Sequence, residues 1–423
     1  MGTNLIIVVN IMNSIAKPRR ALSEPEELRD TEGRSSCNFF RSLGLDYLYV
    51  GEGNDIPSLV AAFAKVKDTS RPTVVHIHTQ KGKGYAPAEA DREEFHWEMP
   101  FDLETGKPKV DCSGMEDYHS LTGKFLLEKM KEDHTVVAIS SGTPTVIGFT
   151  PERRKQAGRQ FVDVGIAEEH AVALASGIAA GGGRPVYGVY STFIQRCYDQ
   201  LSQDLCINGN PAVITVFMGT VAGMNDVTHL GFFDIPLISN IPNMVYLAPT
   251  CSEEYFAMLE WAVRQTEYPV AIRVPGVAVV HRKEEFDTDY SELNRYKMTA
   301  RGETVAILAL GSFYDLGQAL KNKLREESGV EATLINPRYI TGLDEPMLEE
   351  LKVGHRIVVT LEDGVLDGGF GEKIARYYGN SEMRVLNYGL RKEFADRYNL
   401  DELMKANRLT DKQMAEDIAG ILE

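Results

Sequence analysis

Short apolar runs alternate along the chain with longer stretches in which apolar residues recur at helical spacing. Residues 136–140 and 213–217 are runs of this kind, without strict alternation of apolar and polar positions. Such runs are typical of strands covered on both faces of a parallel sheet, and the alternation of strand and helix is typical of βαβ units. The pattern therefore predicts an α/β protein made of successive parallel-sheet domains.

Three regions repeat this plan, and we predict domains at residues 1–115, 116–295 and 296–423. The predicted strands are residues 4–9, 47–50, 73–78, 136–140, 161–164, 186–190, 213–217, 245–248, 304–310, 331–335, 356–361 and 383–386. The helices predicted among the first eight strands are residues 37–43, 56–67, 121–130, 167–180 and 252–265. Residues 86–114 are polar, with several prolines and glycines, and are predicted to form a long surface connection.

The first predicted strand is unusual because residues 5–9 are apolar throughout and nothing precedes the strand. A strand of this kind normally has a neighbour on each side, and an unpaired apolar edge invites pairing with another chain. We therefore expect that sequence before Met1 is missing, and that it is supplied by a partner chain or absent altogether.

Composition excludes some partners. The net charge of −16 argues against nucleic acid and anionic membrane surfaces, which attract basic faces. The five cysteines form no CxxC pair, which indicates reduced thiols in a cytoplasmic protein. No segment approaches the roughly twenty apolar residues of a membrane span. We expect small-molecule substrates, with no nucleic-acid and no membrane partner.

Two strings stand out as candidate chemistry. FVDVGIAEEH, at residues 161–170, places Glu168 and Glu169 in the first turn of a predicted helix. Taken alone, acids at this position are explained by their favourable interaction with the helix dipole. YSTFIQRCYDQ, at residues 190–200, follows the next predicted strand, and its pair of Tyr190 and Phe193 is explained in isolation by core packing.

Together the two strings resemble the signatures of the 1-deoxy-D-xylulose-5-phosphate synthase family and, more loosely, of transketolases. The resemblance implies thiamine diphosphate as cofactor, with the catalytic Glu168 hydrogen-bonded to N1′ of its aminopyrimidine ring. That role needs a carboxyl in a dry pocket, where sharing a proton costs little. The resemblance also implies that Tyr190 and Phe193 stack against the aminopyrimidine, and that Arg196 contacts the substrate.

A third string, KGKGYAPAE at residues 81–89, is a glycine-rich loop with two lysines after a predicted strand. On its own it is either a solvated turn or a loop that brings backbone N–H groups or lysine to an anion. In the family this loop closes over the cofactor, so the resemblance assigns Tyr85 to cofactor binding and His96 to the substrate entrance. Trp97 departs from the glycine that usually follows that histidine.

GMNDVTHLG, at residues 223–231, resembles the GADGPTHHG loop of the family. The resemblance makes His229 a substrate-side catalytic residue, and histidine is suited to carrying a proton near neutral pH. The family aspartate aligns with Asn225, although Asp226 lies next to it, and the second histidine is replaced by Leu230.

The residues that hold a substrate phosphate in the family are incomplete here. Met218 stands where an arginine is usual, and of a later arginine pair only Arg273 remains, with Gly276 in place of the other. The resemblance assigns Arg273 to substrate binding. Because the forked donors of arginine pairs match phosphate oxygens, these losses argue against glyceraldehyde 3-phosphate as the acceptor.

The glycine cluster at residues 362–371 offers two interpretations. EDG at 362–364 and GGFG at 368–371 follow a predicted strand and open a helix, but the spacing is not the GxGxxG of dinucleotide sites. The string resembles the EE–GGFG turn of transketolase C-terminal domains, and we interpret it as structural.

The family holds the cofactor diphosphate through Mg²⁺ with a GDG motif and an NDN-type strand end. Mg²⁺ requires well-placed oxygen ligands. The sequence has no counterpart of GDG, and the strand resembling NDN reads VNIMNSIA at residues 9–16, without the aspartate, and is followed by Arg19 and Arg20 where glycines are usual. We therefore assign no metal ligand, and interpret residues 1–115 as a remnant of the diphosphate-binding domain.

The resemblance implies a transferase that joins a two-carbon unit of pyruvate, with loss of CO₂, to an aldehyde acceptor in isoprenoid and thiamine biosynthesis. It also implies thiamine diphosphate, Mg²⁺ and a homodimer, although we expect this chain alone to bind the cofactor poorly. Two alternatives remain open. One is a subunit of a split transketolase-type enzyme whose partner carries GDG, and the other is a non-catalytic paralogue that binds a full-length synthase.

Overall fold

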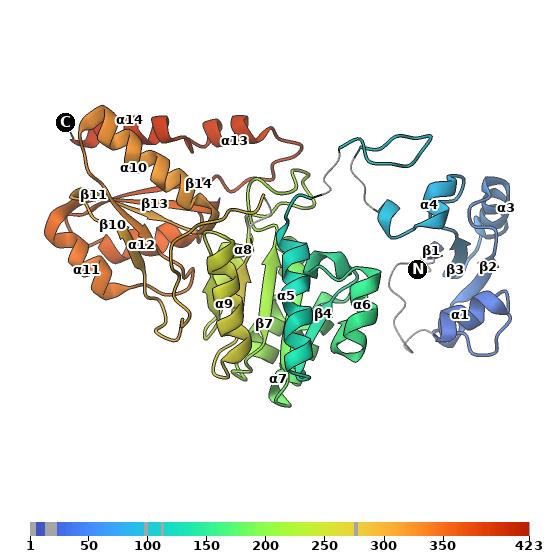
Figure 1. The fold of residues 1–423 in the computed structure, drawn as a ribbon. Coiled ribbons are helices and arrows are strands. Elements are labelled where there is room, and N and C mark those ends of the chain that lie inside the picture. The colour runs from blue at the N-terminus through green and yellow to red at the C-terminus, as the bar shows by residue number, and fades with distance from the viewer. Residues whose placement is uncertain (1–5, 13–22, 97–99, 111–113, 275–277, 423) are drawn as a thin grey trace. The chain divides into compact units, whose positions relative to one another are not determined.

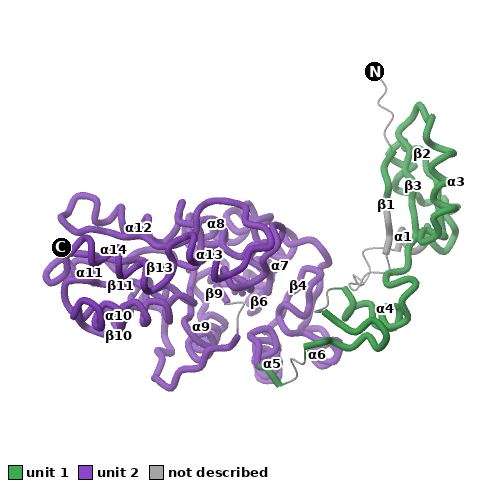
Figure 2. The backbone as a smooth tube through the Cα atoms, turned by 90° about the horizontal axis from the view of Figure 1, so that it is seen from above, with its two compact units in different colours: residues 1–115 green, residues 116–423 purple. Residues whose placement is uncertain are grey.

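The computed structural model describes residues 6–12, 23–96, 100–110, 114–274 and 278–422. The chain forms two compact units, residues 1–115 and residues 116–423 (Figure 2). The following sequence predictions lie outside the described residues: the start of the first strand at residues 4–5, Asn13, Arg19, Arg20, Trp97 and Gly276. No helix among the described residues is long and apolar enough to cross a membrane.

The first unit contains a three-stranded parallel sheet in the order β1-β3-β2. The strands are β1 (Ile6–Met12), β2 (Asp46–Val50) and β3 (Thr73–Thr79). The helices are α1 (Ser23–Asp30), α2 (Phe39–Ser42), α3 (Ile56–Val66) and α4 (Ala86–Ala90), with a 3₁₀ turn at Glu94–His96 (Figure 1). The apolar side chains of α3 pack on one face of this sheet and form a small core with Val50 and Val75.

β1 lies at one edge of this sheet. It pairs in register with β3, from Ile6 opposite Thr73 to Met12 opposite Thr79, and no strand among the described residues pairs with its other edge. Val8 is exposed on this strand. β1 is therefore an edge strand of the described sheet.

The predicted surface connection after residue 85 is partly wrong. Helix α4 and the turn at Glu94–His96 form inside it, and the rings of Tyr85, Phe95 and Phe101 pack on one another with centroids 5.4–6.0 Å apart. Three aromatic rings widely spaced in a polar segment give no periodic signal, so the local sequence does not indicate this cluster.

The second unit begins with a six-stranded parallel sheet in the order β5-β4-β6-β7-β9-β8. Its strands are β4 (Val136–Ser140), β5 (Phe161–Asp163), β6 (Arg184–Tyr190), β7 (Val213–Phe217), β8 (Val245–Leu247) and β9 (Val270–Arg273). Its helices are α5 (Tyr118–Glu132), α6 (Pro151–Ala157), α7 (Glu168–Ala180), α8 (Asp234–Ser239) and α9 (Ser252–Arg264). Shorter helical turns are Pro144–Ile147, Gly158–Gln160, Ile194–Cys197 and the wider Gln200–Cys206.

A five-stranded sheet follows in the order β10-β12-β11-β13-β14, parallel except for β10 at the edge. Its strands are β10 (Lys297–Ala300), β11 (Thr304–Ala309), β12 (Thr333–Asn336), β13 (His355–Val365) and β14 (Arg384–Leu390). Its helices are α10 (Tyr314–Ser328), α11 (Glu345–Gly354), α12 (Phe370–Tyr378), α13 (Leu400–Ala406) and α14 (Asp411–Leu422), with a turn at Gly311–Phe313.

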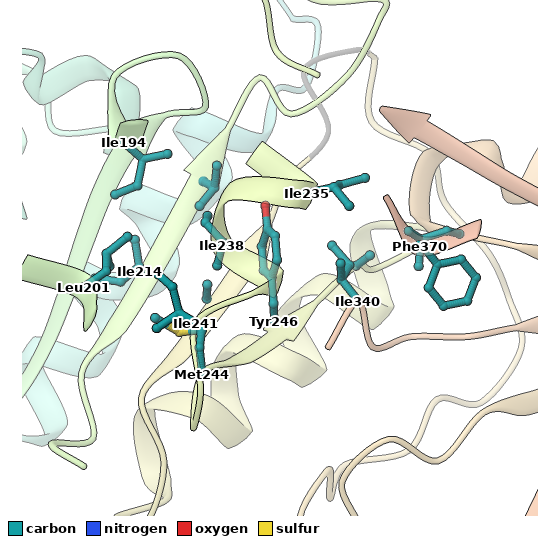
Figure 3. Close-up of a cluster of buried hydrophobic side chains, with 14 of the residues drawn as sticks. Ile194, Leu201, Ile214, Ile235, Ile238, Ile241, Met244, Tyr246, Ile340 and Phe370 are labelled. Atoms are coloured by element: carbon teal, nitrogen blue, oxygen red, sulfur yellow. The ribbon is translucent and has the colours of Figure 1, made fainter. Parts of the chain in front are cut away.

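One apolar core runs from the first of these sheets to the second. It includes Ile214 of β7, Tyr246 of β8 and Phe370 of α12, and in the view of Figure 3 Ile340 lies between Tyr246 and Phe370. Burial of large side chains contributes about 1.5–3 kcal/mol each. The shared core explains why residues 116–423 form one compact unit.

These sheets confirm the predicted fold class of successive parallel-sheet α/β domains. The predicted strands at 136–140 and 213–217 match β4 and β7. The sequence analysis did not indicate the short elements α6, α8, β9 and β10, which are four to seven residues long. The predicted boundary between residues 295 and 296 stays a prediction.

The glycine cluster at residues 362–371 is a helix start held by Glu362. The two Glu362 carboxylate oxygens accept hydrogen bonds from the backbone N–H groups of Phe370, at 2.7 Å, and Gly371, at 2.8 Å. These N–H groups lie in the first turn of α12, where N–H groups have no partner within the helix. A dinucleotide phosphate would bind to such N–H groups, but here Glu362 already occupies them. The contacts support the structural interpretation of this string.

Replacing Glu362 by Gln is expected to remove a pH-dependent part of the stability. Burial raises the pKa of Glu362 to about 7, against about 4.3 in an unfolded chain. A carboxyl with a raised pKa stabilises the fold below its unfolded pKa, and that contribution is lost as the pH rises through the folded value. Between about pH 5 and about pH 8, the free energy of unfolding should fall by about 3 kcal/mol more in the native chain than in the Gln variant.

Guanidinium unfolding of both proteins at the two pH values measures this difference. Glu349→Gln is a matched control, because Glu349 is an exposed glutamate of the same domain whose pKa is lowered, chiefly by Lys352 and then by Tyr377. A difference below about 1 kcal/mol for Glu362→Gln would show that the buried carboxyl is not the source.

Candidate active site

The start of α7 is fixed by the turn that follows β5. Oδ1 of Asp163 accepts hydrogen bonds from the backbone N–H groups of Gly142, at 2.8 Å, and Gly165, at 2.9 Å. Gly165 has a φ of +75°, which glycine adopts without a Cβ clash. This turn delivers Glu168 as the first residue of α7, where it is only 2 % exposed.

Arg196 is the charged partner of Glu168. Its Nη1 atom donates to Oε2 of Glu168 at 3.0 Å. Arg196 comes from the turn Ile194–Cys197, which packs against α7, and its side chain is 51 % exposed. Glu168 is therefore buried, while the side chain of its charged partner reaches solvent.

Aromatic rings form a row where β6 ends. The rings of Tyr190 and Phe193 meet edge-on with centroids 5.7 Å apart, and Phe193 meets His229 in the same manner at 5.5 Å. On the other side of Tyr190 lies His119, at 6.3 Å. Neighbouring rings of this row cross at 66–82°, so the row offers both aromatic faces and edges to a ligand, and it lies at the carboxyl ends of the strands, where open α/β sheets bind ligands.

Sequence reasoning missed His119, which comes from α5. Its ring stacks on Phe217 with centroids 4.8 Å apart. Its Nδ1 atom lies 2.7 Å from the carbonyl oxygen of Val146, and because a carbonyl only accepts, Nδ1 carries the proton. Burial lowers the pKa of His119, so the ring is neutral at pH 7 and Nε2 is an acceptor. No motif surrounds this residue, so no sequence signal identified it.

His229 is paired with Asp226. Its Nδ1 atom donates to Oδ1 of Asp226 at 2.9 Å, and the Thr228 hydroxyl donates to the same oxygen at 2.5 Å. The Thr228 hydrogen bond first, and His229 second, lower the pKa of Asp226 to about 2. Asp226 therefore stays an acceptor for Nδ1 of His229. The family aspartate position, Asn225, donates instead to the carbonyl oxygen of Tyr398 at 3.0 Å.

Arg273 lies inside the protein and is 5 % exposed. Its Nε atom donates to Oδ2 of Asp234 at 2.7 Å, and its Nη2 atom donates to the carbonyl oxygens of Gly231, at 3.2 Å, and Asp363, at 2.5 Å. The Tyr246 hydroxyl donates to Asp234 as well. Arg273 thus already donates its guanidinium N–H groups to protein acceptors, and these are the groups that would bind a substrate phosphate. The predicted substrate contact of Arg273 stays a prediction.

Tyr85 and His96 lie in the first unit. The Tyr85 ring packs on Phe95 and Phe101, and its buried hydroxyl has no hydrogen-bond partner among the described residues. Nζ of Lys81 contacts Nδ1 of His96. Burial lowers the pKa of both groups, and the Lys81 charge lowers that of His96 further. A neutral His96 imidazole can accept from the Lys81 ammonium.

The structure thus brings one set of predicted residues together. Within residues 116–423 these are Glu168, Tyr190, Phe193, Arg196 and His229. A buried carboxyl near a row of aromatic rings fits a planar aminopyrimidine that offers a ring nitrogen. In the described ranges there is no group of three or more His, Cys, Asp and Glu side chains that could hold a metal ion.

Two family descriptions match the second unit. Residues 116–279 match the pyrimidine binding domain of transketolase, and residues 295–414 match the C-terminal domain of transketolase. Glu168, the aromatic row and the pair of Asp226 and His229 all lie in the first of these ranges. The chain belongs to the transketolase family, which confirms the family predicted from the sequence motifs.

Within that family the chain is similar to 1-deoxy-D-xylulose-5-phosphate synthases. It is 34 % identical over 394 residues to the synthase of Clostridium acetobutylicum, covering 90 % of this chain and 60 % of that protein. It is 35 % identical over 383 residues to the synthase of Alkaliphilus oremlandii, covering 90 % and 60 %. The chain therefore spans about three fifths of the length of these relatives.

Two solved structures share the fold. A split-gene transketolase, described as an inactive β4 tetramer, has a TM-score of 0.59 at 22 % identity, covering 71 % of this chain and 95 % of that chain. A transketolase of Pichia stipitis in complex with xylulose 5-phosphate has a TM-score of 0.59 at 15 % identity, covering 90 % and 67 %. At these identities the likeness shows the fold alone.

Proposed function

We propose that the chain forms the pyrimidine-binding side of a thiamine-diphosphate-dependent transferase of the 1-deoxy-D-xylulose-5-phosphate synthase type. The reaction moves a two-carbon unit from pyruvate, with release of CO₂, to an aldehyde acceptor. The observation that carries this proposal is the buried Glu168 at the start of α7, next to a turn that carries Phe193 and Arg196. A carboxyl at an exposed helix start would support only the interpretation of a helix-dipole partner.

Each residue of the site has a role in this proposal. Thiamine diphosphate supplies, when bound, the electron sink that cleavage beside a carbonyl requires. Glu168 shares a proton with N1′ of the aminopyrimidine, and Tyr190 and Phe193 hold the ring flat. Arg196 moves from Glu168 toward the substrate carboxylate, for which its exposed side chain has room. His229 exchanges a proton through Nε2, since Asp226 holds Nδ1.

The acceptor in this proposal is an aldehyde without a bound phosphate. Two of the family arginines are absent, at Met218 and Gly276. The third, Arg273, already donates to Asp234 and to two backbone carbonyls. Phosphate oxygens are bound best by the paired N–H donors of arginine. At these three positions the chain has no arginine whose donors are left for a phosphate.

The active species in this proposal contains more than one chain, either two copies of this chain or this chain with a GDG-bearing polypeptide. The split-gene transketolase, described as an inactive β4 tetramer, supports a division of this kind. The proposal also includes Mg²⁺ as the metal that accompanies the cofactor, and a cytoplasmic location. Tyr85 contacts the cofactor in this proposal, and His96 contacts the substrate.

Calorimetric titration of thiamine diphosphate with Mg²⁺ tests the proposal. For the purified chain alone we expect a Kd weaker than about 100 µM, because a pyrimidine pocket without its diphosphate anchor forfeits most of the charge-assisted contacts. With a GDG-bearing chain from the same source we expect a Kd of about 1 µM or below, together with release of CO₂ from pyruvate.

Thiamine with Mg²⁺ is the control ligand, because it carries the pyrimidine without the diphosphate. Tight binding of thiamine diphosphate by the chain alone would contradict the two-chain arrangement. Stable association with the GDG-bearing chain but no CO₂ release would contradict the transferase and identify a non-catalytic paralogue.

A further inference from the structure

The loop of residues 218–231, which carries His229, is held by the domain of the five-stranded sheet. Two of its apolar side chains, Val221 and Leu230, are buried in the core formed by β11, β13 and α14. Leu230 is one of the departures from the family pattern, and this packing accounts for an apolar residue there. The loop therefore follows β7 of the six-stranded sheet in sequence, but its apolar side chains pack on the domain of the five-stranded sheet.

The 394–398 segment, between β14 and α13, supplies most of the hydrogen bonds to this loop. Asp396 accepts from the N–H of Val227 at 3.1 Å, and the Arg397 N–H donates to the Asn225 carbonyl at 2.6 Å. The Tyr398 hydroxyl donates to the carbonyl oxygen of Val221 at 2.7 Å. The Asn225 side chain donates in return to the Tyr398 carbonyl at 3.0 Å.

A second anchor comes from the end of β13. Oδ1 of Asp363, which is buried, accepts from the N–H of Val221 at 2.7 Å. The other Asp363 oxygen accepts from the Ser312 hydroxyl. Buried hydrogen bonds to a carboxylate are worth about 1.5–3 kcal/mol each, so this end of the loop is held firmly.

Backbone strain indicates that the surroundings impose this conformation. Met218, where the loop begins, has a φ of +57°, and Arg397, inside the 394–398 segment, has a φ of +48°. A non-glycine residue in this region costs about 1–3 kcal/mol and persists only where neighbouring contacts hold it. A Cβ on Gly231 would lie 1.8 Å from the Met218 carbonyl oxygen, so the closing end of the loop is equally constrained.

Few hydrogen bonds tie the loop to the domain of the six-stranded sheet. The Thr192 hydroxyl donates to the carbonyl of Thr228 at 3.0 Å, Arg273 of β9 donates to the carbonyl of Gly231 at 3.2 Å, and the His229 ring meets Phe193. Because most of the loop's anchors come from the other domain, they set where Asp226 and His229 lie relative to Glu168.

We propose that the 394–398 segment is a clamp that positions His229 over the pyrimidine site, and that Asp396 and Tyr398 are positioning residues. The proposal rests on the proposed function for its catalytic meaning, but the clamp itself is a property of this chain. Displacement of a catalytic group by about 1 Å can cost about 100-fold in rate, so release of the clamp lowers kcat without removing any reacting group.

Hydrogen exchange, followed by mass spectrometry, tests the clamp without any turnover. In Tyr398→Phe and Asp396→Ala, the amides of residues 219–230 should exchange about fivefold faster than in the native chain, since each variant removes an anchor worth about 1 kcal/mol. Asp396→Asn should restore protection, because its amide oxygen can still accept from Val227. Tyr388→Phe is the matched control, since its hydroxyl donates to Asp417 in the same domain and not to the loop.

The melting temperatures of all four variants separate a clamp from general stabilisation. We expect the loop variants and Tyr388→Phe to lose similar stability, while only Tyr398→Phe and Asp396→Ala expose the loop. Unchanged exchange in both loop variants, or equal exposure in Tyr388→Phe, would overturn the clamp.

Kinetics of the assembly with the GDG-bearing chain then test its catalytic meaning. We expect kcat to fall about tenfold or more in Tyr398→Phe and Asp396→Ala, with the thiamine diphosphate Kd unchanged and Asp396→Asn close to native. Faster exchange with unchanged kcat would overturn the positioning role. Faster exchange in an assembly that never turns over would leave the clamp standing and contradict the proposed function.

Discussion

Replacing Glu168 by Gln is expected to lower pyruvate turnover by about 100- to 10,000-fold in the assembled enzyme, the range that positioned acid–base groups contribute. Gln keeps the shape of the side chain and an oxygen for Arg196, but it has no proton to share with N1′ of the aminopyrimidine. The fold should be unchanged, because the turn before α7 is held by Asp163 rather than by Glu168. CO₂ release from pyruvate, measured with saturating thiamine diphosphate and Mg²⁺, gives the effect.

Glu169→Gln is the control for this variant. Glu169 is the next residue of α7, carries the same charge and faces solvent, so its replacement changes the helix-dipole interaction without touching the buried site. Turnover within about twofold of native is expected for it. Equal losses in both variants, or native turnover in Glu168→Gln, would show that the acids serve the helix and not the chemistry.

Replacing Arg273 by Met is expected to destabilise the second unit by about 3–5 kcal/mol, the cost of leaving buried carboxylates without their partner. The variant removes the charged partner of Asp234, which is 2 % exposed, and the guanidinium that lies 4.0 Å from the carboxylate of Asp363, which is 1 % exposed. It also removes the hydrogen bonds by which Arg273 links Asp234 of α8, in the domain of the six-stranded sheet, to Asp363 of β13, in the five-stranded sheet. Guanidinium unfolding followed by circular dichroism measures the loss.

Arg301→Met is the matched control, since the ion pair of Arg301 with Glu350 is exposed on the surface of the same unit. Such pairs contribute about 0–1 kcal/mol. A loss for Arg273→Met no larger than for Arg301→Met would contradict the buried link. Native stability with a raised KM for the aldehyde acceptor would instead favour the substrate role that the family resemblance assigns to Arg273.

The sequence alone indicated the fold class and a candidate location for the chemistry. Apolar runs such as residues 136–140 and 213–217 correspond to β4 and β7, because a strand buried on both faces must be apolar throughout. Glu168 was identified by its place between a strand and a helix, in a string with a family resemblance. Both signals are local, since neighbouring residues carry them.

Tertiary structure decided the partners of these residues. Asn225 meets Tyr398 across 173 positions of sequence, and Arg273 meets Asp363 across 90. The pairing of Asp226 with His229 is close in sequence, but the adjacent Asn225 and Asp226 both carry a side-chain oxygen that could accept from His229, and only the path of the loop selects one. His119 joined the site because α5 packs beside β6 and β7 with no motif to mark it.

The sequence by itself thus determined the alternation of strands and helices along the chain and which strings hold acid, aromatic and imidazole groups. These follow from periodicity and residue type, which are written along the chain. Tertiary structure decided that Arg273 is buried between aspartates and that the loop of His229 is held by the domain that follows it. Burial and long-range hydrogen bonds depend on which surfaces meet, and short polar segments such as residues 394–398 carry no periodic signal of their partner.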